Sequence, residues 1–211
     1  HTIQGGGPAA TSTVAAARLG LSAAIISAVG DDDAGRRILR DFAEEKVDTS
    51  GIVVRAGRTS PVAYCWVDEP TGKRSVAWTR GDTEELGDSE ADLSLLEGAK
   101  ILHIDGHNPK GAIAAARRAK QLGVLVNYDA GTIRDGAEEL LPLADILIAS
   151  EAFARNWTGE NDLEKALVKL SAYNAKVVGC TMGEHGSMCY ENGGFVKCPA
   201  FKNDPVDTTG A

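Results

Sequence analysis

The chain has 211 residues and a formal net charge of −8. This length is compatible with one large domain, and because only 5% of the residues are aromatic, its core must consist mainly of Ala, Val, Leu and Ile. The acidic balance argues against nucleic acids and anionic membrane surfaces as partners, and no apolar run approaches the ~20 residues that a membrane-spanning helix needs. The four cysteines form no C-x-x-C pair, which is typical of free thiols in a reducing compartment. We therefore expect a cytoplasmic protein.

Short apolar runs alternate with amphipathic segments along most of the chain. The runs at residues 23–30, 100–105, 124–129, 145–150 and 176–181 predict buried strands. Helices are predicted at residues 34–46 and 109–122, and after Asn161, which is expected to cap the third helix. Unbroken apolar strands that alternate with helices are typical of a parallel sheet covered by helices on both faces. The sequence therefore predicts a single α/β domain over residues 1–211.

Residues 51–80 depart from this rhythm, because they contain strand patterns and no helix pattern. Around the turn residues 69–72 they predict a β-hairpin whose strands carry Tyr64, Trp66 and Trp78. Three interpretations remain open: a lid over a ligand, an interface between subunits, and an ordinary surface hairpin. Trp66 and Trp78 are expected to pack rather than to form stacking platforms. We favour a β-lid insertion that also forms a homodimer contact.

The glycine-rich segment GGGPAAT stands near the start of the chain. Gly5, Gly7 and Ala10 formally fit the dinucleotide-binding pattern G-x-G-x-x-A. That pattern needs a preceding strand, and only residues 1–4 are available to form one. Pro8 suits the first turn of a helix, so the segment predicts a glycine turn that leads into a helix. Free amides there can approach a ligand hydroxyl or phosphate closely, and a plain connecting turn is the alternative.

Asp31, Asp32 and Asp33 stand side by side before a predicted helix. A cluster of carboxylates can suggest a metal site. Acidic residues directly before Ala34 suit the positive end of a helix dipole better, so we expect a helix start.

Three segments together resemble the ribokinase-like, or PfkB, family of carbohydrate kinases. The first is GGPAATSTVAAARLG, residues 6–20, followed by VGDDDAG, residues 29–35. The second is TMGEHG, residues 181–186, which is similar to the family's T-x-G-x-x-G turn at the nucleotide. The third is VDTTGA, residues 206–211, which looks like the opening of the family's D-T-x-G-A-G-D signature. Their order and spacing fit the family over the whole chain.

This resemblance implies a ribokinase-like three-layer α/β/α fold with a mostly parallel central sheet and a small β-lid. It implies that the amides of Gly210 and Ala211 form an anion hole for the transferred phosphoryl group. The general base would be an Asp two positions beyond Ala211, so we expect the chain to be incomplete at both ends. The family also implies a monovalent-cation site, with K⁺ as the candidate ion, at Asp207 and Thr209.

By the same resemblance, the sugar is expected to contact Gly6, Gly7, Thr11, Asp105 and Asn108. Asp105 and Asn108 also follow a predicted strand, and open α/β sheets bind ligands at the carboxyl ends of their strands. Thr11 stands where the family usually has Asn.

The nucleotide, ATP with Mg²⁺, is expected to contact Ser150, Thr181, Gly183 and Gly186. The family's N-x-x-E motif, which is linked to Mg²⁺ and phosphate, falls on SEAF in this chain. Ser150 therefore replaces the Asn, and Phe153 replaces the Glu.

We predict an ATP-dependent sugar kinase that transfers the γ-phosphate to a hydroxyl of a pentose or ketohexose. Its partners would be the sugar and ATP, with no nucleic acid and no membrane. Two alternatives remain open: a non-catalytic homologue that binds sugar or nucleotide, and an NAD-dependent oxidoreductase that uses the turn at Gly5, Gly7 and Ala10.

Overall fold

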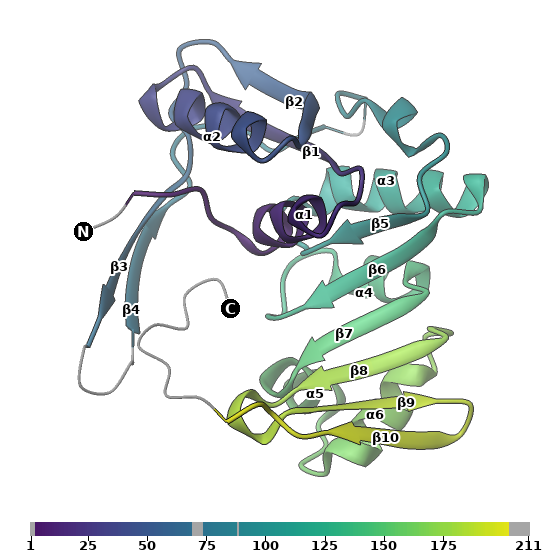
Figure 1. Cartoon of the computed structure of the whole chain (residues 1–211). Helices are drawn as coiled ribbons and strands as arrows, with labels where there is room; N and C mark the ends of the chain where they lie inside the picture. Colours follow the sequence, from purple (N-terminus) through teal and green to yellow (C-terminus); the bar gives the residue numbers. More distant parts are fainter. Residues whose placement is uncertain (1–2, 69–73, 88, 203–211) are drawn as a thin grey trace. The chain divides into compact units, whose positions relative to one another are not determined.

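The computed structural model describes residues 3–68, 74–87 and 89–202. These residues form two compact units, one that ends at Asp92 and one that spans Leu93–Lys202 (Figure 1). Each unit has its own strands and helices. Within the described ranges, no helix combines the length and the apolar character needed to cross a membrane.

The first unit is built on a parallel pair of strands, β1 (Ala24–Gly30) and β2 (Asp48–Arg55). The helix α2 (Asp33–Glu44) connects the two strands, and α1 (Pro8–Arg18) precedes them. Parallel strands need a crossover connection, which is why an amphipathic helix follows β1. Ile25, Phe42 and Val47 form the buried centre of this unit. The strand predicted at residues 23–30 and the helix predicted at 34–46 are thereby confirmed.

The predicted hairpin is present in the first unit as an antiparallel pair, β3 (Val62–Val67) and β4 (Arg74–Thr79). The turn predicted at residues 69–72 lies outside the described residues. Residues 51–55 of the predicted insertion belong to β2 and pair with β1. The hairpin itself therefore begins after Pro61.

The aromatic side chains of the hairpin are exposed. Tyr64, Trp66 and Trp78 have exposed fractions of 64%, 60% and 61%, and the ring centroids of Tyr64 and Trp66 lie 6.4 Å apart. The interpretation in which the hairpin tryptophans pack is therefore wrong. Tyr64 and Trp66 share one face of the hairpin, whereas Trp78, opposite Ala63 in the register, lies on the other face. Exposed apolar side chains that lie together are typical of a surface that contacts a ligand or a partner.

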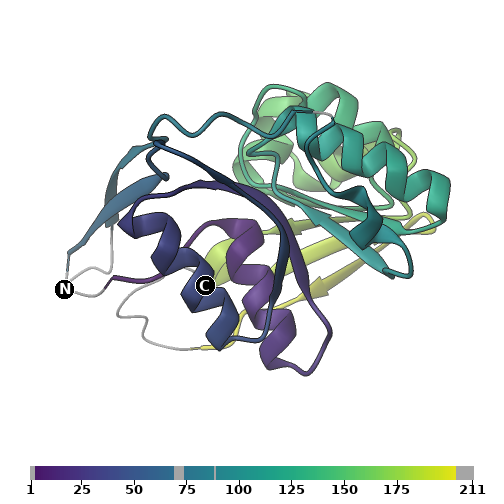
Figure 2. The same cartoon turned by 90° about the horizontal axis from the view of Figure 1, so that it is seen from above.

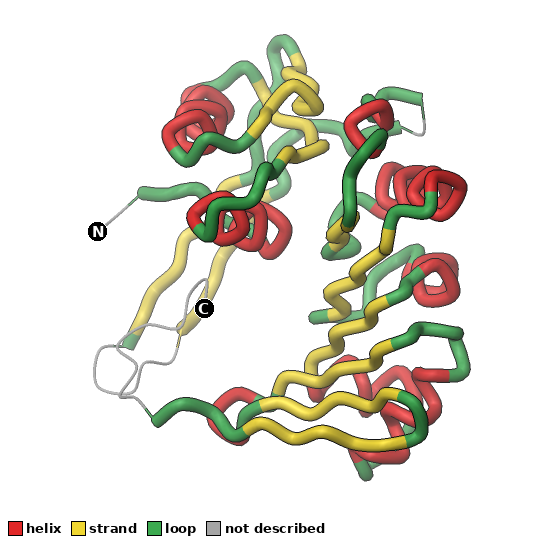
Figure 3. Tube along the Cα trace, turned by 45° about the vertical axis from the view of Figure 1, so that its right-hand side comes forward, coloured by secondary structure: helices red, strands yellow, loops and turns green. Residues whose placement is uncertain are grey.

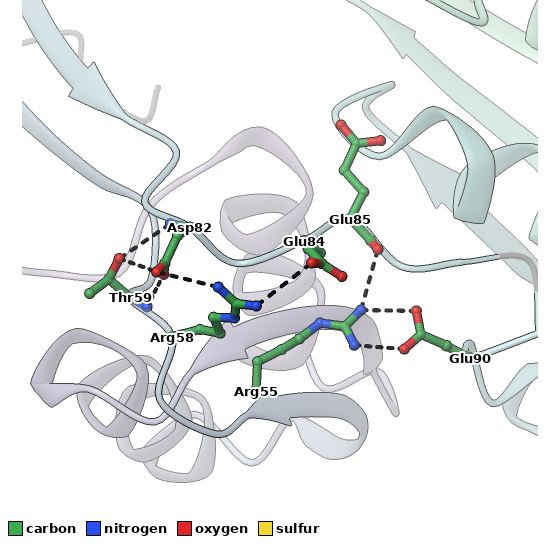
Figure 4. A network of polar contacts seen from close by, with 7 residues as sticks. All are labelled: Arg55, Arg58, Thr59, Asp82, Glu84, Glu85 and Glu90. Atoms are coloured by element: carbon green, nitrogen blue, oxygen red, sulfur yellow. Dashed lines mark hydrogen bonds and ion pairs between the residues drawn. The ribbon is translucent and has the colours of Figure 1, made fainter.

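Charged side chains hold the segment after the hairpin to the end of β2 (Figure 4). Arg55 donates from Nη1 and Nη2 to the two carboxylate oxygens of Glu90, at 2.6 and 2.9 Å, and from Nη2 to the carbonyl oxygen of Glu85 at 3.3 Å. Such two-pronged contacts between guanidinium and carboxylate are among the stronger hydrogen bonds in proteins. The hydrogen bonds from Arg55 and from the Gly87 amide lower the pKa of Glu90 to about 2.

Glu90→Gln is expected to remove part of the acid sensitivity of folding. The pKa of Glu90 is about 2 in the folded chain, against about 4.3 for an unfolded chain. Its stabilising effect is therefore present above about pH 4.3 and is lost as the pH falls toward 2. Urea unfolding across this range should show a smaller loss of unfolding free energy in the variant than in the wild type.

Glu84→Gln is the matched control, because the ion pair of Glu84 with Arg58 is longer, at 3.8 Å. Equal acid-side losses in the wild type and in Glu90→Gln would contradict this account of the Arg55–Glu90 contact.

The second unit is a six-stranded sheet with helices packed against it (Figure 3). Its strands are β5 (Ile101–Ile104), β6 (Leu125–Ala130), β7 (Ile146–Ser150), β8 (Val177–Thr181), β9 (Ser187–Glu191) and β10 (Gly194–Cys198). Their order is β10-β9-β8-β7-β6-β5, with β5 to β8 parallel and β9 and β10 antiparallel to their neighbours. This confirms the mostly parallel sheet and the four strands predicted beyond residue 99.

The helices of the second unit cover one face of its sheet, as the view in Figure 2 shows. They are α3 (Pro109–Leu122), α4 (Ala137–Leu140), α5 (Glu151–Thr158) and α6 (Leu163–Ser171), with the 3-10 turns η1 (Leu93–Leu96), η2 (Leu141–Leu143) and η3 (Gly183–His185). In β6, Val126, Tyr128 and Ala130 are buried, and Asn127 and Asp129 between them are half-buried. Successive residues of a strand point to opposite faces, so the buried apolar residues of β6 face one side of the sheet, and Asn127 and Asp129 face the other.

Candidate active site

The predicted sugar contacts Gly6, Gly7 and Thr11 meet at the N-terminus of α1. Gly7 precedes the helix with φ 105° and ψ 145°, which favours glycine, and Pro8 is the first helical residue. The amide of Thr11 donates to the carbonyl oxygen of Gly7 at 2.9 Å. A Cβ atom built on Gly6 or Gly7 would meet no atom within 4 Å. The three residues are exposed, so the turn leaves room for a ligand beside its backbone.

No strand precedes this turn among the described residues, because residues 3–6 are irregular. The dinucleotide-binding pattern requires a strand at that place. The structure therefore gives no support to the oxidoreductase alternative.

Asp105 and Asn108 lie in the loop between β5 and α3, at the carboxyl end of β5. Asp105 Oδ1 accepts a hydrogen bond from the amide of His107 at 3.0 Å. Asn108 precedes α3, yet its side chain makes no capping hydrogen bond, so its amide group is not committed to the helix. Between them, Gly106 has φ 74°, and a Cβ atom there would lie 3.2 Å from the hydroxyl oxygen of Tyr128. The loop therefore stays close to the end of β6.

Two polar side chains inside the sheet lie near this loop, and neither was predicted from the sequence as a site residue. Asn127 Nδ2 and His103 Nδ1 are 2.7 Å apart across β5 and β6. Their other polar atoms, His103 Nε2 and Asn127 Oδ1, are buried without a hydrogen-bond partner among the described residues. Buried polar atoms are normally paired, so water or a ligand group is expected at these two atoms. The available signal was one polar residue in the otherwise apolar β5 and polar residues at alternate positions of β6.

Asp129 is the penultimate residue of β6, two residues after Asn127. Burial raises the pKa of its carboxyl group; the Asp105 carboxylate raises it further, and His103 and His107 act in the opposite direction. Carboxyl groups with a displaced pKa that lie among polar side chains are typical of functional sites.

Ser150, a predicted nucleotide contact, forms the end of β7 and the start of α5. Its hydroxyl accepts from the amide of Phe153 at 3.0 Å and donates to the carbonyl oxygen of Gly131 at 2.8 Å. Ser150 also pairs in register with Thr181 of β8, so two predicted nucleotide contacts are neighbours on adjacent strands.

Phe153, which stands where the family has Glu, belongs to the core of the second unit. It is 1% exposed and stacks on Trp157 with ring centroids 5.6 Å apart. Glu151 forms an ion pair with Arg155, at 2.8 Å between Oε1 and Nη2. The first turn of α5 therefore offers neither the family's Glu nor an uncommitted carboxylate as a substitute.

The T-x-G-x-x-G segment forms the turn between β8 and β9. The amide of Met182 donates to the carbonyl oxygen of Gly186 at 2.8 Å, which closes the turn. Gly186 has φ 87°, and a Cβ atom there would lie 2.0 Å from the carbonyl oxygen of Cys198. Gly183 has φ 56°, and a Cβ atom there would meet nothing within 4 Å. Gly186 is therefore required by the turn itself, whereas Gly183 borders open space.

The predicted anion-hole residues Gly210 and Ala211 and the predicted cation ligands Asp207 and Thr209 lie outside the described residues. In the part of the chain that the structure describes, no group of three or more His, Cys, Asp or Glu could hold a metal ion.

The acidic triplet at residues 31–33 is a helix start, as predicted. The side chain of Asp32 accepts a hydrogen bond from the amide of Gly35 in the first turn of α2.

Comparison with known proteins gives a match along nearly the whole chain. The family model for pfkB family carbohydrate kinases matches residues 2–211. An ATP-dependent ribose-1-phosphate kinase of Halopiger xanaduensis is 34% identical over 98% of this chain and 69% of its own length. A ribokinase of Haemophilus influenzae is 29% identical over 100% of this chain and 71% of its own length.

Solved structures give the same fold. A protein of Agrobacterium tumefaciens assigned as a ribokinase matches with a TM-score of 0.85 and 26% identity, over 96% of this chain and 67% of its own. A protein of E. coli assigned as a ribokinase II, solved with ATP and Mg²⁺, matches with a TM-score of 0.83 and 22% identity, over 97% of this chain and 72% of its own.

The family match contains all three of the segments on which the resemblance rested, and the named relatives are kinases of sugars or sugar phosphates. The oxidoreductase alternative is therefore wrong. The chain has the ribokinase-like α/β fold and belongs to the pfkB family of carbohydrate kinases, which are phosphotransferases with an alcohol group as acceptor.

Proposed function

We propose that this protein transfers the γ-phosphate of ATP to a hydroxyl of a small sugar of the pentose or ketohexose type. The observation that carries the proposal is the family match over residues 2–211, which includes the glycine turn before α1, the turn between β8 and β9, and the last six residues. Relatives that act on ribose 1-phosphate, fructose or ribose by name support this substrate class.

The sugar would be held by two groups of residues with different chemistry. Gly6, Gly7 and Thr11 would offer the exposed backbone and hydroxyl at the start of α1. Asp105 and Asn108 would offer a carboxylate and an amide at the end of β5. Sugar hydroxyls both donate and accept hydrogen bonds, so this mixture of donors and acceptors suits them.

The nucleotide would lie at the ends of β7 and β8. Ser150 and Thr181 are paired there, and the open space beside Gly183 leaves room for a ligand next to the backbone. Mg²⁺ in such sites is usually held by one or two carboxylates together with the phosphates of the substrate. The first turn of α5 has no uncommitted carboxylate, so we propose that Mg²⁺ enters bound to ATP and that ATP supplies several of its ligands.

Catalysis would depend on residues 206–211. Phosphoryl transfer requires positioning and stabilisation of developing negative charge, and amides at a helix N-terminus supply both. We propose Gly210 and Ala211 for this anion hole, an Asp that follows them as the base, and Asp207 and Thr209 as ligands of a monovalent cation such as K⁺.

The hairpin would act as a lid and as the contact of a homodimer in the cytoplasm. Tyr64 and Trp66 expose apolar surface on one face of the hairpin and Trp78 exposes it on the other, so the lid contact and the dimer contact could each cover one face. Sedimentation of the intact protein should give a dimer, and sugar should change the fluorescence of the hairpin tryptophans. A monomer whose tryptophan fluorescence does not respond to sugar would rule out both the lid role and the dimer contact of the hairpin.

Gly183→Ala is expected to weaken binding of ATP–Mg²⁺ by about 10-fold, which corresponds to about 1.4 kcal/mol. The new methyl group would occupy open space in the turn, where the nucleotide is proposed to approach the backbone. Calorimetric titration with ATP–Mg²⁺ measures the effect.

Gly193→Ala is the matched control, because Gly193 belongs to the β9–β10 turn but resembles Gly183 in its surroundings. Its φ is also positive, at 80°, and a Cβ atom built there would also meet nothing within 4 Å. The two variants should lose similar stability from the backbone strain. Equal ATP affinities in the two variants would remove Gly183 from the nucleotide site.

The kinase activity itself is tested by a coupled assay of ADP release over pentoses, ketohexoses, their phosphates and nucleosides. We expect sugar-dependent release with one group of these acceptors. Binding of sugar or ATP without turnover of any acceptor would favour the non-catalytic homologue instead, an alternative that the replacement of the family's Glu by the buried Phe153 keeps open.

A further inference from the structure

The base of the hairpin is more tightly packed than the hairpin itself. Of the residues the structure describes, three polar ones are buried, and two of these, Ser60 and Thr83, flank the hairpin on either side. Ser60 is 2% exposed and stands two residues before β3. Pro61 lies between Ser60 and β3, and its fixed φ restricts the backbone there, so the orientation of Ser60 limits the direction of the strand.

Asp32 holds Ser60 through both carboxylate oxygens. Ser60 Oγ donates to Oδ1 at 2.7 Å, and the amide of Ser60 donates to Oδ2 at 2.9 Å. The same hydroxyl accepts from the amide of Gly30, at the end of β1, at 2.9 Å. Burial acts to raise the pKa of Asp32, but the hydrogen bonds from Ser60 and Gly35 outweigh it and lower that pKa, which keeps the carboxylate ionised.

Helix capping explains only part of this arrangement. The cap uses Oδ1, which accepts from the amide of Gly35 at 2.8 Å. A residue that only capped α2 would leave Oδ2 to solvent, but here Oδ2 accepts from the amide of Ser60. Asp32 therefore links the start of α2 to the entry of the hairpin.

Two glycines allow this close approach. A Cβ atom on Gly30 would lie 2.1 Å from the carbonyl oxygen of Arg58 and 2.9 Å from the amide nitrogen of Ser60. A Cβ atom on Gly35 would lie 2.0 Å from the carbonyl oxygen of Gly30 and 2.9 Å from Ser60 Oγ. Gly30 and Gly35, the two glycines of the segment VGDDDAG, therefore leave the space that the backbone and side chain of Ser60 occupy.

The exit of the hairpin is joined to its entry by a second set of contacts, part of which Figure 4 shows. The amide and the hydroxyl of Thr59 donate to Asp82 Oδ1 at 2.5 and 2.9 Å. The hydroxyl of Thr83 donates to the carbonyl oxygen of Thr59 at 2.6 Å. Because Thr59 precedes Ser60, any movement of Ser60 is transmitted to both strands of the hairpin.

We propose that Asp32 is a positioning residue for the kinase reaction: through Ser60 it fixes the direction in which the β3–β4 hairpin leaves the β1–β2 pair. The inference rests on the proposed function, in which this hairpin is the lid over the sugar. A hairpin held in one direction would close on the sugar without first being ordered. When only a fraction of molecules is competent to bind, the apparent dissociation constant rises in inverse proportion to that fraction.

The test compares Asp32→Asn and Ser60→Ala with the wild type in the intact protein. Asp32→Asn removes one acceptor for Ser60, and Ser60→Ala leaves the cap of α2 in place. Asp33→Asn is the matched control, because Asp33 belongs to the same triplet, is fully exposed and pairs with Arg36. Amide hydrogen exchange is measured over residues 62–67 and 74–79, with β6 and β7 as the internal reference, and KM for the sugar is measured together with kcat.

We expect both test variants to accelerate exchange in the hairpin by about 10-fold without accelerating it in β6 and β7. KM for the sugar should rise by about 10-fold while kcat falls less, since an interaction that only orders the lid is recovered once the complex has formed. Asp33→Asn should match the wild type in both measurements.

Wild-type exchange in the hairpin of both variants would overturn the proposal. Acceleration of equal size in the hairpin, β6 and β7 would also overturn it, because that result would mean that the variants lower the stability of the whole chain. If the wild type phosphorylates no sugar, the proposed function fails, and the exchange data alone then decide whether Asp32 orders the hairpin.

Discussion

Gly210→Val is expected to lower kcat by about 10²–10³, or roughly 3–4 kcal/mol of transition-state stabilisation, because it displaces one donor of the proposed anion hole. A branched side chain would stand where the γ-phosphate must pass, and it would tilt the neighbouring amides. Sugar affinity should change much less, since the proposed hydroxyl contacts are Gly6, Gly7 and the residues at the end of β5. Steady-state kinetics and direct sugar titration of the intact protein separate the two quantities.

The melting temperature must be measured beside kcat. If Gly210 serves only as a turn at a helix start, the variant will lose stability while its folded fraction keeps the wild-type kcat. That outcome would show that this turn is not the anion hole.

Phe153→Glu restores the residue type of the family motif, and we expect it to damage the fold without improving the reaction. Phe153 is 1% exposed and stacked on Trp157. Removing a buried Phe ring typically costs about 3–5 kcal/mol of unfolding free energy, so we expect that loss for Phe153→Ala. Phe153→Glu should lose at least as much, because a buried carboxylate must find a partner or take up a proton.

Glu151→Gln is the control on the same helix turn. It removes a partly exposed ion pair with Arg155, which is typically worth about 0.2–1 kcal/mol. Urea denaturation followed by circular dichroism measures all three variants. If Phe153→Glu is as stable as the wild type and has a lower KM for ATP–Mg²⁺, the side chain reaches the nucleotide and our assignment of this position to the core is wrong.

Local chemistry was sufficient to predict some boundaries from the sequence. The helix α3 spans Pro109–Leu122 as predicted, because Pro109 suits a first helical turn and Gly123 ends the helix with φ 73°. The cap of α6 was predicted one residue too early: Asp162, not Asn161, accepts from the amide of Glu164 at 2.9 Å. Two adjacent residues with equal capping ability cannot be told apart by pattern alone.

Contacts between side chains of different helices and strands could not be predicted from the sequence. The His103–Asn127 pair depends on the register of β5 against β6, in which these two residues are opposite each other. The link from Asp32 to Ser60 joins residues 28 positions apart and requires the close approach at Gly30. A sequence pattern within one segment predicts neither of these two contacts, because each depends on how two segments are placed against each other.

The candidate site also contains residues that the sequence could identify and features that only the folded chain shows. Gly6, Gly7 and Thr11 could be named because one short motif contains them, and the structure places them together at the start of α1. The packing expected of Trp66 and Trp78 is absent from the described chain, in which both rings are exposed, because only the folded chain shows what covers an aromatic residue of a strand.

The most direct test of the kinase proposal is to follow the γ-phosphate itself. The intact protein is incubated with ATP labelled in its terminal phosphate, Mg²⁺ and the sugar that gives the fastest ADP release, and the products are separated. We predict that the label appears in a sugar phosphate in amounts equal to the ADP formed, and that Gly210→Val forms both products more slowly by the same factor. Label that appears only as inorganic phosphate, or ADP release that does not depend on the sugar, would contradict the account.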